Sequence, residues 1–297
     1  MLSLIVFLPL LAAVGLAAVP ATAGARVFVR SWIAVAALDV ALIVAAWIGY
    51  EGGLAYEENL RWIPSAGVGY HVGVDGLSLP LVAMTAVLFL ACAVFALRHT
   101  DRVKSFVLLF LFLQTVSLGL FVALDLILFF VYFDLSIVAM YFVIAGWGHG
   151  TARRAALTFF LYTFVGSLAL LLGFIGLYLA AEPHTFDIVE LARANPLAGS
   201  GVYGALVLLA VGVGLAVKTP TVPFHTWLPP AHTDAPAAGS AILAGFFSRW
   251  APTGSSASRC RCCPTRGGPM PRSSSPSGWS RSSTARSSRW PRRTSSG

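Results

Sequence analysis

Charged residues are scarce in this sequence. Only 11% of its 297 residues are Asp, Glu, Lys or Arg, whereas soluble domains carry about 25%. Hydrophobic residues make up 57% of the chain, and several apolar stretches reach the length of about 18 residues that a helix needs to cross a bilayer. The composition argues against an ordinary soluble domain. It predicts an all-α polytopic membrane protein, because helices satisfy their own backbone hydrogen bonds in lipid.

Motifs that bind nucleotides or metals are also missing. The sequence contains no GxGxxG, P-loop or HExxH pattern. Its cysteines are few: Cys92 lies in an apolar run, while Cys260, Cys262 and Cys263 show neither the spacing of zinc ligands nor a disulfide framework. We therefore predict no metal site, and no soluble domain of this chain that would hold a nucleotide, haem or iron–sulfur cluster.

Acidic residues are absent from the last part of the chain. All twelve acids and half of the twenty basic residues lie in residues 1–248, so the net charge of +8 comes from residues 249–297. This last segment lacks Leu, Ile, Val, Phe and Tyr and is rich in Ser, Arg, Pro and Gly. Because it cannot bury a core, we expect a disordered tail. We expect its positive charge to meet lipid or another chain, not nucleic acid.

Seven apolar spans and a shorter eighth precede the tail. They cover approximately residues 2–20, 29–49, 77–97, 105–123, 125–147, 155–181, 201–218 and 236–248. Basic residues gather in the odd-numbered loops, at Arg26, Arg30, Arg98, Arg102, Lys104, Arg153 and Arg154. The even-numbered loops are mostly acidic, and their basic residues are Arg61 and Arg193. The positive-inside rule then predicts an N-terminus outside the cell and odd-numbered loops in the cytoplasm.

Three ionisable residues fall within these spans: Asp39, Asp134 and Lys218. Charges at this depth are costly, usually face the protein interior or a water-filled cavity, and often mark an ion path. Alone, Asp134 would take up a proton and Lys218 would lose one, whereas as a pair each stabilises the charge of the other. The pair is a candidate switch for loading and releasing protons, and a static ion pair that fixes helix packing is the alternative. For Asp39 we expect a structural role.

A proline-rich segment follows Lys218. Its prolines are Pro220, Pro223, Pro229, Pro230 and Pro236. Proline removes a backbone donor and clashes with the preceding turn, so the helix is expected to break after Lys218. Broken helices at membrane depth line cavities, where their free backbone groups bind ions or order water. His225 and His232 lie in this break and are candidates for a proton relay, because histidine titrates near neutrality. Two hydrogen-bonded structural histidines are the alternative.

The stretch "VKTPTVPFHTWLPPAHTDAPAAGSAILAG", which begins at Val217, resembles the signature of the antiporter-like membrane subunits of respiratory complex I, the proton-pumping NADH:quinone oxidoreductase. "GVDGLSLPLV" at 73–82 and "FDLSIVAMYFVIAGWGHGTARRAALTFFLYT" at 133–163 add to the resemblance, which covers nearly all of residues 1–248. It implies an antiporter-like helix bundle with a discontinuous seventh helix, incomplete at the C-terminus.

The resemblance also implies roles for individual residues. Lys218 matches the lysine of the broken helix, and Asp134 matches an acid of the fifth helix that is usually glutamate. His225 and His232 match the two histidines of the signature. All four are therefore expected to take part in proton translocation. Pro230 departs from the pattern, because the family commonly has aspartate there, and this removes an acid from the break.

The function that follows from the resemblance is proton translocation without redox chemistry in this chain. The expected location is the bacterial plasma membrane, and the expected partners are the lipid bilayer and the other membrane subunits of complex I. Cofactors are expected on other subunits of the complex, namely NADH, FMN, iron–sulfur clusters and quinone, and no independent active site is expected here. One alternative is a subunit of a multisubunit cation/proton antiporter, which shares this fold and signature. Another is an inactive truncated fragment.

A change of reading frame would explain the composition of the tail. We wrote a continuation typical of the family, K-M-G-T-Y-G-F-V-R-I-A-V-P-L-L-P, in plausible GC-rich codons and dropped one base. The result translates as "RWAPTGSSASRCRCCP", the sequence of residues 249–264. We therefore hypothesise a one-base shift near codon 248, which resequencing the gene would test. The product would lack the later helices of the family.

Overall fold

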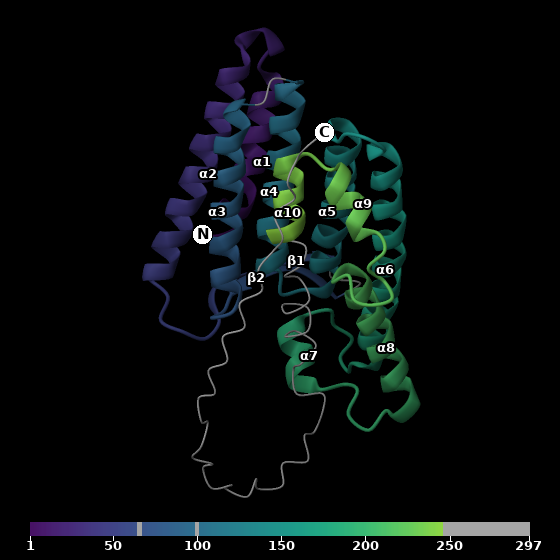
Figure 1. The fold of residues 1–297 in the computed structure, drawn as a ribbon. Helices are drawn as coiled ribbons and strands as arrows, with labels where there is room; N and C mark the ends of the chain where they lie inside the picture. Colours follow the sequence, from purple (N-terminus) through teal and green to yellow (C-terminus); the bar gives the residue numbers. More distant parts are fainter. Residues whose placement is uncertain (64–66, 99–100, 246–297) are drawn as a thin grey trace, which may run out of the picture. The chain divides into compact units, whose positions relative to one another are not determined.

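The computed structural model describes residues 1–63, 67–98 and 101–245 (Figure 1). The predicted tail, residues 249–297, lies outside the described residues, as do the last positions of the eighth predicted span. The helices are α1 (Leu2–Ala18), α2 (Ala25–Ile48), α3 (Ser78–Phe95), α4 (Val103–Val122), α5 (Leu126–Trp147), α6 (Ala152–Ala180), α7 (Ile188–Ala194), α8 (Gly201–Lys218), α9 (Leu228–Asp234) and α10 (Ala237–Gly245). Two strands, β1 (Ala55–Ile63) and β2 (Val68–Val74), form a hairpin between α2 and α3.

Every predicted apolar span corresponds to a helix in the structure. Within the described residues, six helices are long and apolar enough to cross a membrane: α2, α3 with the 3-10 turn that extends it to Arg98, α4, α5, α6 and α8. Helix α1 is apolar but has 17 residues, slightly fewer than the roughly 18 that a span requires. The prediction of an all-α, multi-pass membrane protein is confirmed.

The helices pack in two groups along the chain. Helix α1 packs against α2 and α4, and α2 packs against α3, whereas α6 packs against α5 and α8. Contacts between α4 and α5 join the two groups, which Figure 1 shows in purple to blue and in teal to green. Small residues allow the close approach of α6 and α8: a Cβ atom added to Gly214 would lie 2.8 Å from the backbone oxygen of Gly166.

The chain is interrupted after α8, as the prolines predict. Helix α8 ends at Lys218, residues 219–227 form turns, and α9 begins at Leu228 with prolines in its first turn, where proline is tolerated. Helix α9 packs against α6. Helix α10 then packs against α3, α5 and α9, so it returns from the second group to the first (Figure 1). The predicted discontinuous helix is confirmed.

The connection between α2 and α3 was expected only as one of the even-numbered, mostly acidic loops. In the structure it forms an antiparallel hairpin, in which Asn59 pairs with His71 and Arg61 with Gly69. The backbone N–H of Leu124, between α4 and α5, donates to the His71 carbonyl at 2.9 Å. The hairpin is therefore bound to the loop that connects the two helix groups.

Asp125 begins helix α5 at the end of that loop. Its carboxylate accepts hydrogen bonds from the backbone N–H groups of Ile127 and Leu128 at 2.8 and 3.1 Å, and from Gly69 of the hairpin at 3.0 Å. These bonds satisfy N–H groups that the first turn of a helix leaves without partners. Burial raises the pKa of Asp125, although the three backbone donors favour its charged form. Asp125 therefore caps the N-terminal end of α5.

Candidate functional site

Lys218 is buried at the last residue of α8. Only 1% of its surface is exposed. Its Nζ atom lies 4.2 Å from the centroid of the Phe133 ring of α5, a distance at which an ammonium group is attracted to the ring face. The C-terminal end of a helix also favours a positive charge. The fold therefore brings the lysine of the helix break against the middle of the fifth helix.

Residues of the break donate hydrogen bonds to the carbonyl groups at the end of α8. Thr221 donates from both its backbone N–H and its Oγ1 hydroxyl to the carbonyl of Ala216, at 3.2 and 3.1 Å. Trp227, which is fully buried, donates from Nε1 to the carbonyl of Val217 at 3.0 Å. These contacts replace helix hydrogen bonds that are lost because Pro220 cannot donate one. The break is thus a folded structure that holds Lys218 in place.

Asp134 lies on α5 next to Phe133 and is half-buried. It follows Phe133, the residue whose ring the Lys218 Nζ approaches to 4.2 Å. The Oδ1 atom of Asp134 is buried and has no hydrogen-bond partner within the described part of the chain. The structure thus places Lys218 against the turn of α5 that carries Asp134, and their pairing stays a prediction.

The two histidines of the break lie in different surroundings. His232 is half-buried on α9, and its Nδ1 lies 2.8 Å from the hydroxyl oxygen of Ser240 on α10. His225 is exposed on the surface of this chain, and its backbone oxygen accepts a hydrogen bond from Leu228. His232 therefore joins the two short helices that follow the break, whereas His225 faces outward from the chain.

Asp39 belongs to a separate site between α2 and α4. It is fully buried, and its Oδ2 accepts a hydrogen bond of 2.7 Å from Nε2 of Gln114. The other end of the Gln114 amide accepts a hydrogen bond of 3.2 Å from Nε1 of Trp32. Asp39 is thus hydrogen-bonded to a side chain of the neighbouring helix α4, and its structural role stays a prediction.

A third polar cluster lies outside the membrane spans. His71 of the hairpin is 3% exposed, with Nδ1 at 2.5 Å from Asp187 and Nε2 at 2.9 Å from Glu57. A neutral imidazole has a single N–H donor, so both contacts are hydrogen bonds only if the ring or one carboxyl carries an additional proton. This cluster connects the hairpin to the segment that precedes α7.

Several residues of these sites were not predicted from the sequence. Gln114 had a usable signal, because it is a lone amide in the apolar run 105–123. Ser167 had none, since nothing in its spacing indicates a neighbour. Trp227 lies in the stretch that carries the resemblance, but its contact with Val217 could not be read from the sequence. His71 was visible only as a polar residue in an even-numbered loop.

Comparison with known proteins agrees with this architecture. Residues 123–256 match the transmembrane family described as NADH:quinone oxidoreductase/Mrp antiporter. The chain is 37% identical over 263 residues to NADH-quinone oxidoreductase subunit M of Rhodobacter capsulatus, an alignment that covers 83% of this chain and 51% of that protein. A subunit M from Rickettsia prowazekii is 38% identical over 196 residues, covering 65% of this chain and 39% of the relative.

Solved structures have the same arrangement of helices. Respiratory complex I from Thermus thermophilus contains a chain that superimposes with a TM-score of 0.74 and 29% identity, covering 84% of this chain and 50% of that one. The fold therefore indicates a membrane protein of the antiporter-like class. Residues 123–256 are similar to the transmembrane region of the NADH:quinone oxidoreductase/Mrp antiporter family. It spans about half the length, or less, of the curated relatives described above.

Proposed function

We propose that this chain is a non-redox, proton-translocating membrane subunit of a bacterial NADH:quinone oxidoreductase, similar to subunit M. The observation that carries the proposal is a buried lysine at the end of a broken helix, whose Nζ lies 4.2 Å from the ring of Phe133, the residue before Asp134 on the fifth helix. NADH, FMN, iron–sulfur clusters and quinone would then be bound by other subunits. The partners would be the other membrane subunits of that complex in the plasma membrane.

The proposed switch follows from the opposite charges of the two residues. When Lys218 and Asp134 are close, each stabilises the charged form of the other, so Lys218 keeps its proton. When they separate, burial favours neutrality, and Lys218 releases a proton while Asp134 takes one up. A conformational change that alters their separation would therefore move protons. We propose that His232 and His225 pass protons onward from the break.

Replacing Lys218 with Met in the assembled complex tests the proposal. The variant keeps an unbranched side chain and removes the ammonium group, so proton pumping driven by NADH should fall by about tenfold or more, because 1.4 kcal/mol in the free energy of proton loading already changes occupancy tenfold. Lys104→Met is a matched control, since Lys104 contacts the backbone oxygens of Ala17 and Val19 and not the candidate site. Unchanged pumping in a fully assembled Lys218→Met complex would contradict the proposal.

A subunit of a cation/proton antiporter is the second candidate function. The Mrp complex of Dietzia sp. DQ12-45-1b contains a chain with a TM-score of 0.71 and 20% identity, which shows the same fold. Such a subunit would exchange cations for protons in vesicles without NADH or quinone. Cation-dependent proton movement in that assay, together with no effect of Lys218→Met on respiration, would favour this alternative. An inactive fragment would support neither activity.

A further inference from the structure

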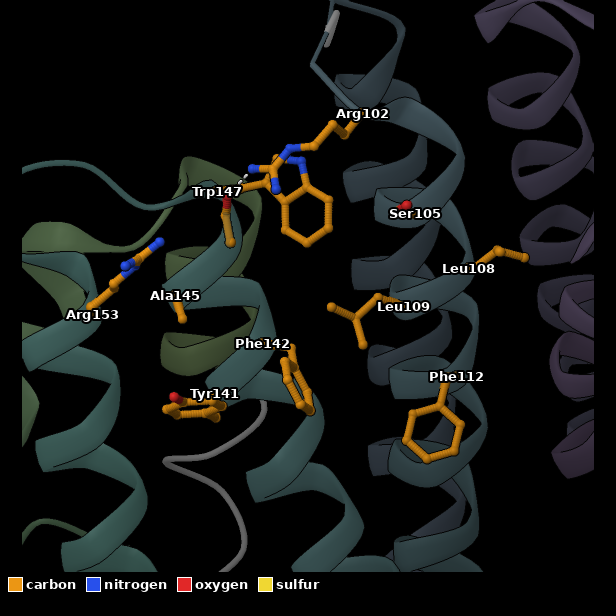
Figure 2. A pocket seen from close by; sticks show the side chains of 11 residues that line it. Arg102, Ser105, Leu108, Leu109, Phe112, Tyr141, Phe142, Ala145, Trp147 and Arg153 are labelled. Carbon is orange, nitrogen blue, oxygen red and sulfur yellow. Dashed lines mark hydrogen bonds between the residues drawn. The ribbon is translucent and has the colours of Figure 1, made fainter. Parts of the chain in front are cut away.

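A groove lies between α4 and α5, near the start of α4 and the end of α5. It encloses about 710 Å³ and is open along one side (Figure 2). Leu109 and Phe112 of α4 and Phe142 of α5 form much of its apolar lining. Phe142 is 53% exposed on this chain. In a membrane-spanning region this surface would meet hydrocarbon, so the lining suits an acyl chain.

The mouth of the groove is positively charged. Arg102 at the start of α4 and Arg153 in the first turn of α6 both line it, beside Trp147 at the end of α5 (Figure 2). Between Arg102 at the mouth and Phe112 the groove follows about 15 Å of helix, since each residue advances a helix by 1.5 Å. The groove is therefore basic at one end and apolar along the rest of its length.

Contacts within the chain hold Arg102 at the mouth. Its guanidinium lies 4.9 Å from the centroid of the Trp147 ring, and Trp147 donates from Nε1 to the carbonyl of Asp101 at 3.1 Å. Arg102 also donates to the Gly146 carbonyl and, at 3.3 Å, to the Asp101 carboxylate. A guanidinium has five N–H donors, so these two bonds leave donors for a further oxyanion. The arginine is thus positioned and still able to bind.

The expected cytoplasmic position of the groove favours a lipid with a negative headgroup. The charges of the loops assign this end of α4 and α5 to the cytoplasm, and the cytoplasmic leaflet is the negatively charged one. Tryptophan is enriched at the level of lipid headgroups, where Trp147 would lie. Basic pockets between helices on this side suit anionic headgroups. We propose that the groove binds an anionic phospholipid, with its phosphate between Arg102 and Arg153 and its acyl chain against Phe142.

Lipid retention by the purified full chain tests this site. Phosphatidylglycerol or phosphatidylcholine would be titrated into the protein in detergent, and bound lipid counted by native mass spectrometry. Phosphatidylglycerol should bind more tightly. Arg153→Gln should weaken its binding by about fivefold, the factor expected for one basic residue near a lipid surface. Arg154→Gln is the matched control, because Arg154 lies on the same turn of α6 but does not line the groove; it should leave binding unchanged.

Two results would overturn the proposal. One is equal binding of the two lipids, and the other is equal loss of binding in Arg153→Gln and Arg154→Gln, because both would indicate nonspecific attraction. Ala145→Phe provides a separate test, since it fills the groove without changing charge and should reduce lipid binding. Unaltered binding in a stable Ala145→Phe protein would also count against the site.

A fluorescence measurement gives a second readout of the site that does not depend on the Arg153→Gln and Ala145→Phe variants. Brominated acyl chains quench nearby tryptophans, and the contribution of Trp147 is the difference from a Trp147→Phe protein. Brominated phosphatidylglycerol should quench Trp147 more than brominated phosphatidylcholine at equal mole fraction. Equal quenching by the two lipids would contradict the proposal.

Discussion

Asp39 and Asp134 are both aspartates within apolar membrane helices, yet their neighbours differ. Asp39, between α2 and α4, accepts a hydrogen bond from the neutral amide of Gln114. Asp134, on α5, follows Phe133, whose ring lies 4.2 Å from the ammonium group of Lys218. An amide fixes a carboxyl in place whichever protonation state it adopts, whereas a nearby cation makes its charge depend on the distance between the two groups. From this comparison we expect that Asp39 stabilises helix packing, whereas Asp134 takes part in a proton switch.

Changing each aspartate to asparagine tests this contrast most directly. Asp134→Asn removes the negative charge that is proposed to stabilise the ammonium form of Lys218. Proton pumping by the assembled complex should therefore fall by about tenfold or more. Asp39→Asn keeps an oxygen acceptor for Gln114, so pumping should remain close to that of the unaltered protein. The measurement is NADH-driven acidification in vesicles of known complex content. A similar loss in both variants would remove the distinction between the sites.

Gly214→Ala should destabilise the second helix group alone. The added methyl would lie 2.8 Å from the backbone oxygen of Gly166, and overpacking of this kind costs about 1–3 kcal/mol. Gly212→Ala is the control, because a Cβ at Gly212 would have no neighbour within 4 Å among the described residues. Thermal unfolding in detergent measures the difference. Equal unfolding temperatures for the two variants would show that α6 and α8 separate easily.

Gln114→Leu should destabilise the first helix group. It removes hydrogen bonds to both Asp39 and Trp32, and such bonds between membrane helices are worth about 1–2 kcal/mol in model peptides. Thr115→Val is a suitable control, since the buried Thr115 hydroxyl donates to the Leu111 carbonyl of its own helix. If denaturant unfolding of Gln114→Leu matched that of Thr115→Val, the amide would not be the structural partner of Asp39.

The smallest effect is expected at the break. Trp227→Phe keeps an aromatic ring but removes the donor to the Val217 carbonyl, a loss of about 0.5–1.5 kcal/mol. Because Val217 precedes Lys218, the variant should also reduce pumping slightly, unlike Trp47→Phe at an exposed position on α2. Thermal unfolding and pumping would be measured on the same preparations. A stable variant with normal pumping would show that the break does not depend on this contact.

Much of the fold was predictable from local sequence. Long apolar runs identify membrane helices because lipid leaves the backbone few alternatives, and the prolines after Lys218 identify the break because they remove helix hydrogen bonds. The hairpin around His71 was not predicted, since polar and apolar residues alternate only weakly along its strands. The roles of Asp134, Lys218, His225 and His232 remain predictions, and the exposed position of His225 was not foreseen.

The sequence by itself determined that this protein spans a membrane, where its helices lie, that Lys218 precedes a helix break and that Asp134 lies within another apolar span. These properties depend on hydrophobic length and on proline, which act locally along the chain. Only the tertiary structure decided that Gln114 is the partner of Asp39 and that Lys218 lies against Phe133. The physical reason is that a membrane helix is apolar on every face, so its sequence carries little information about which face meets which neighbour.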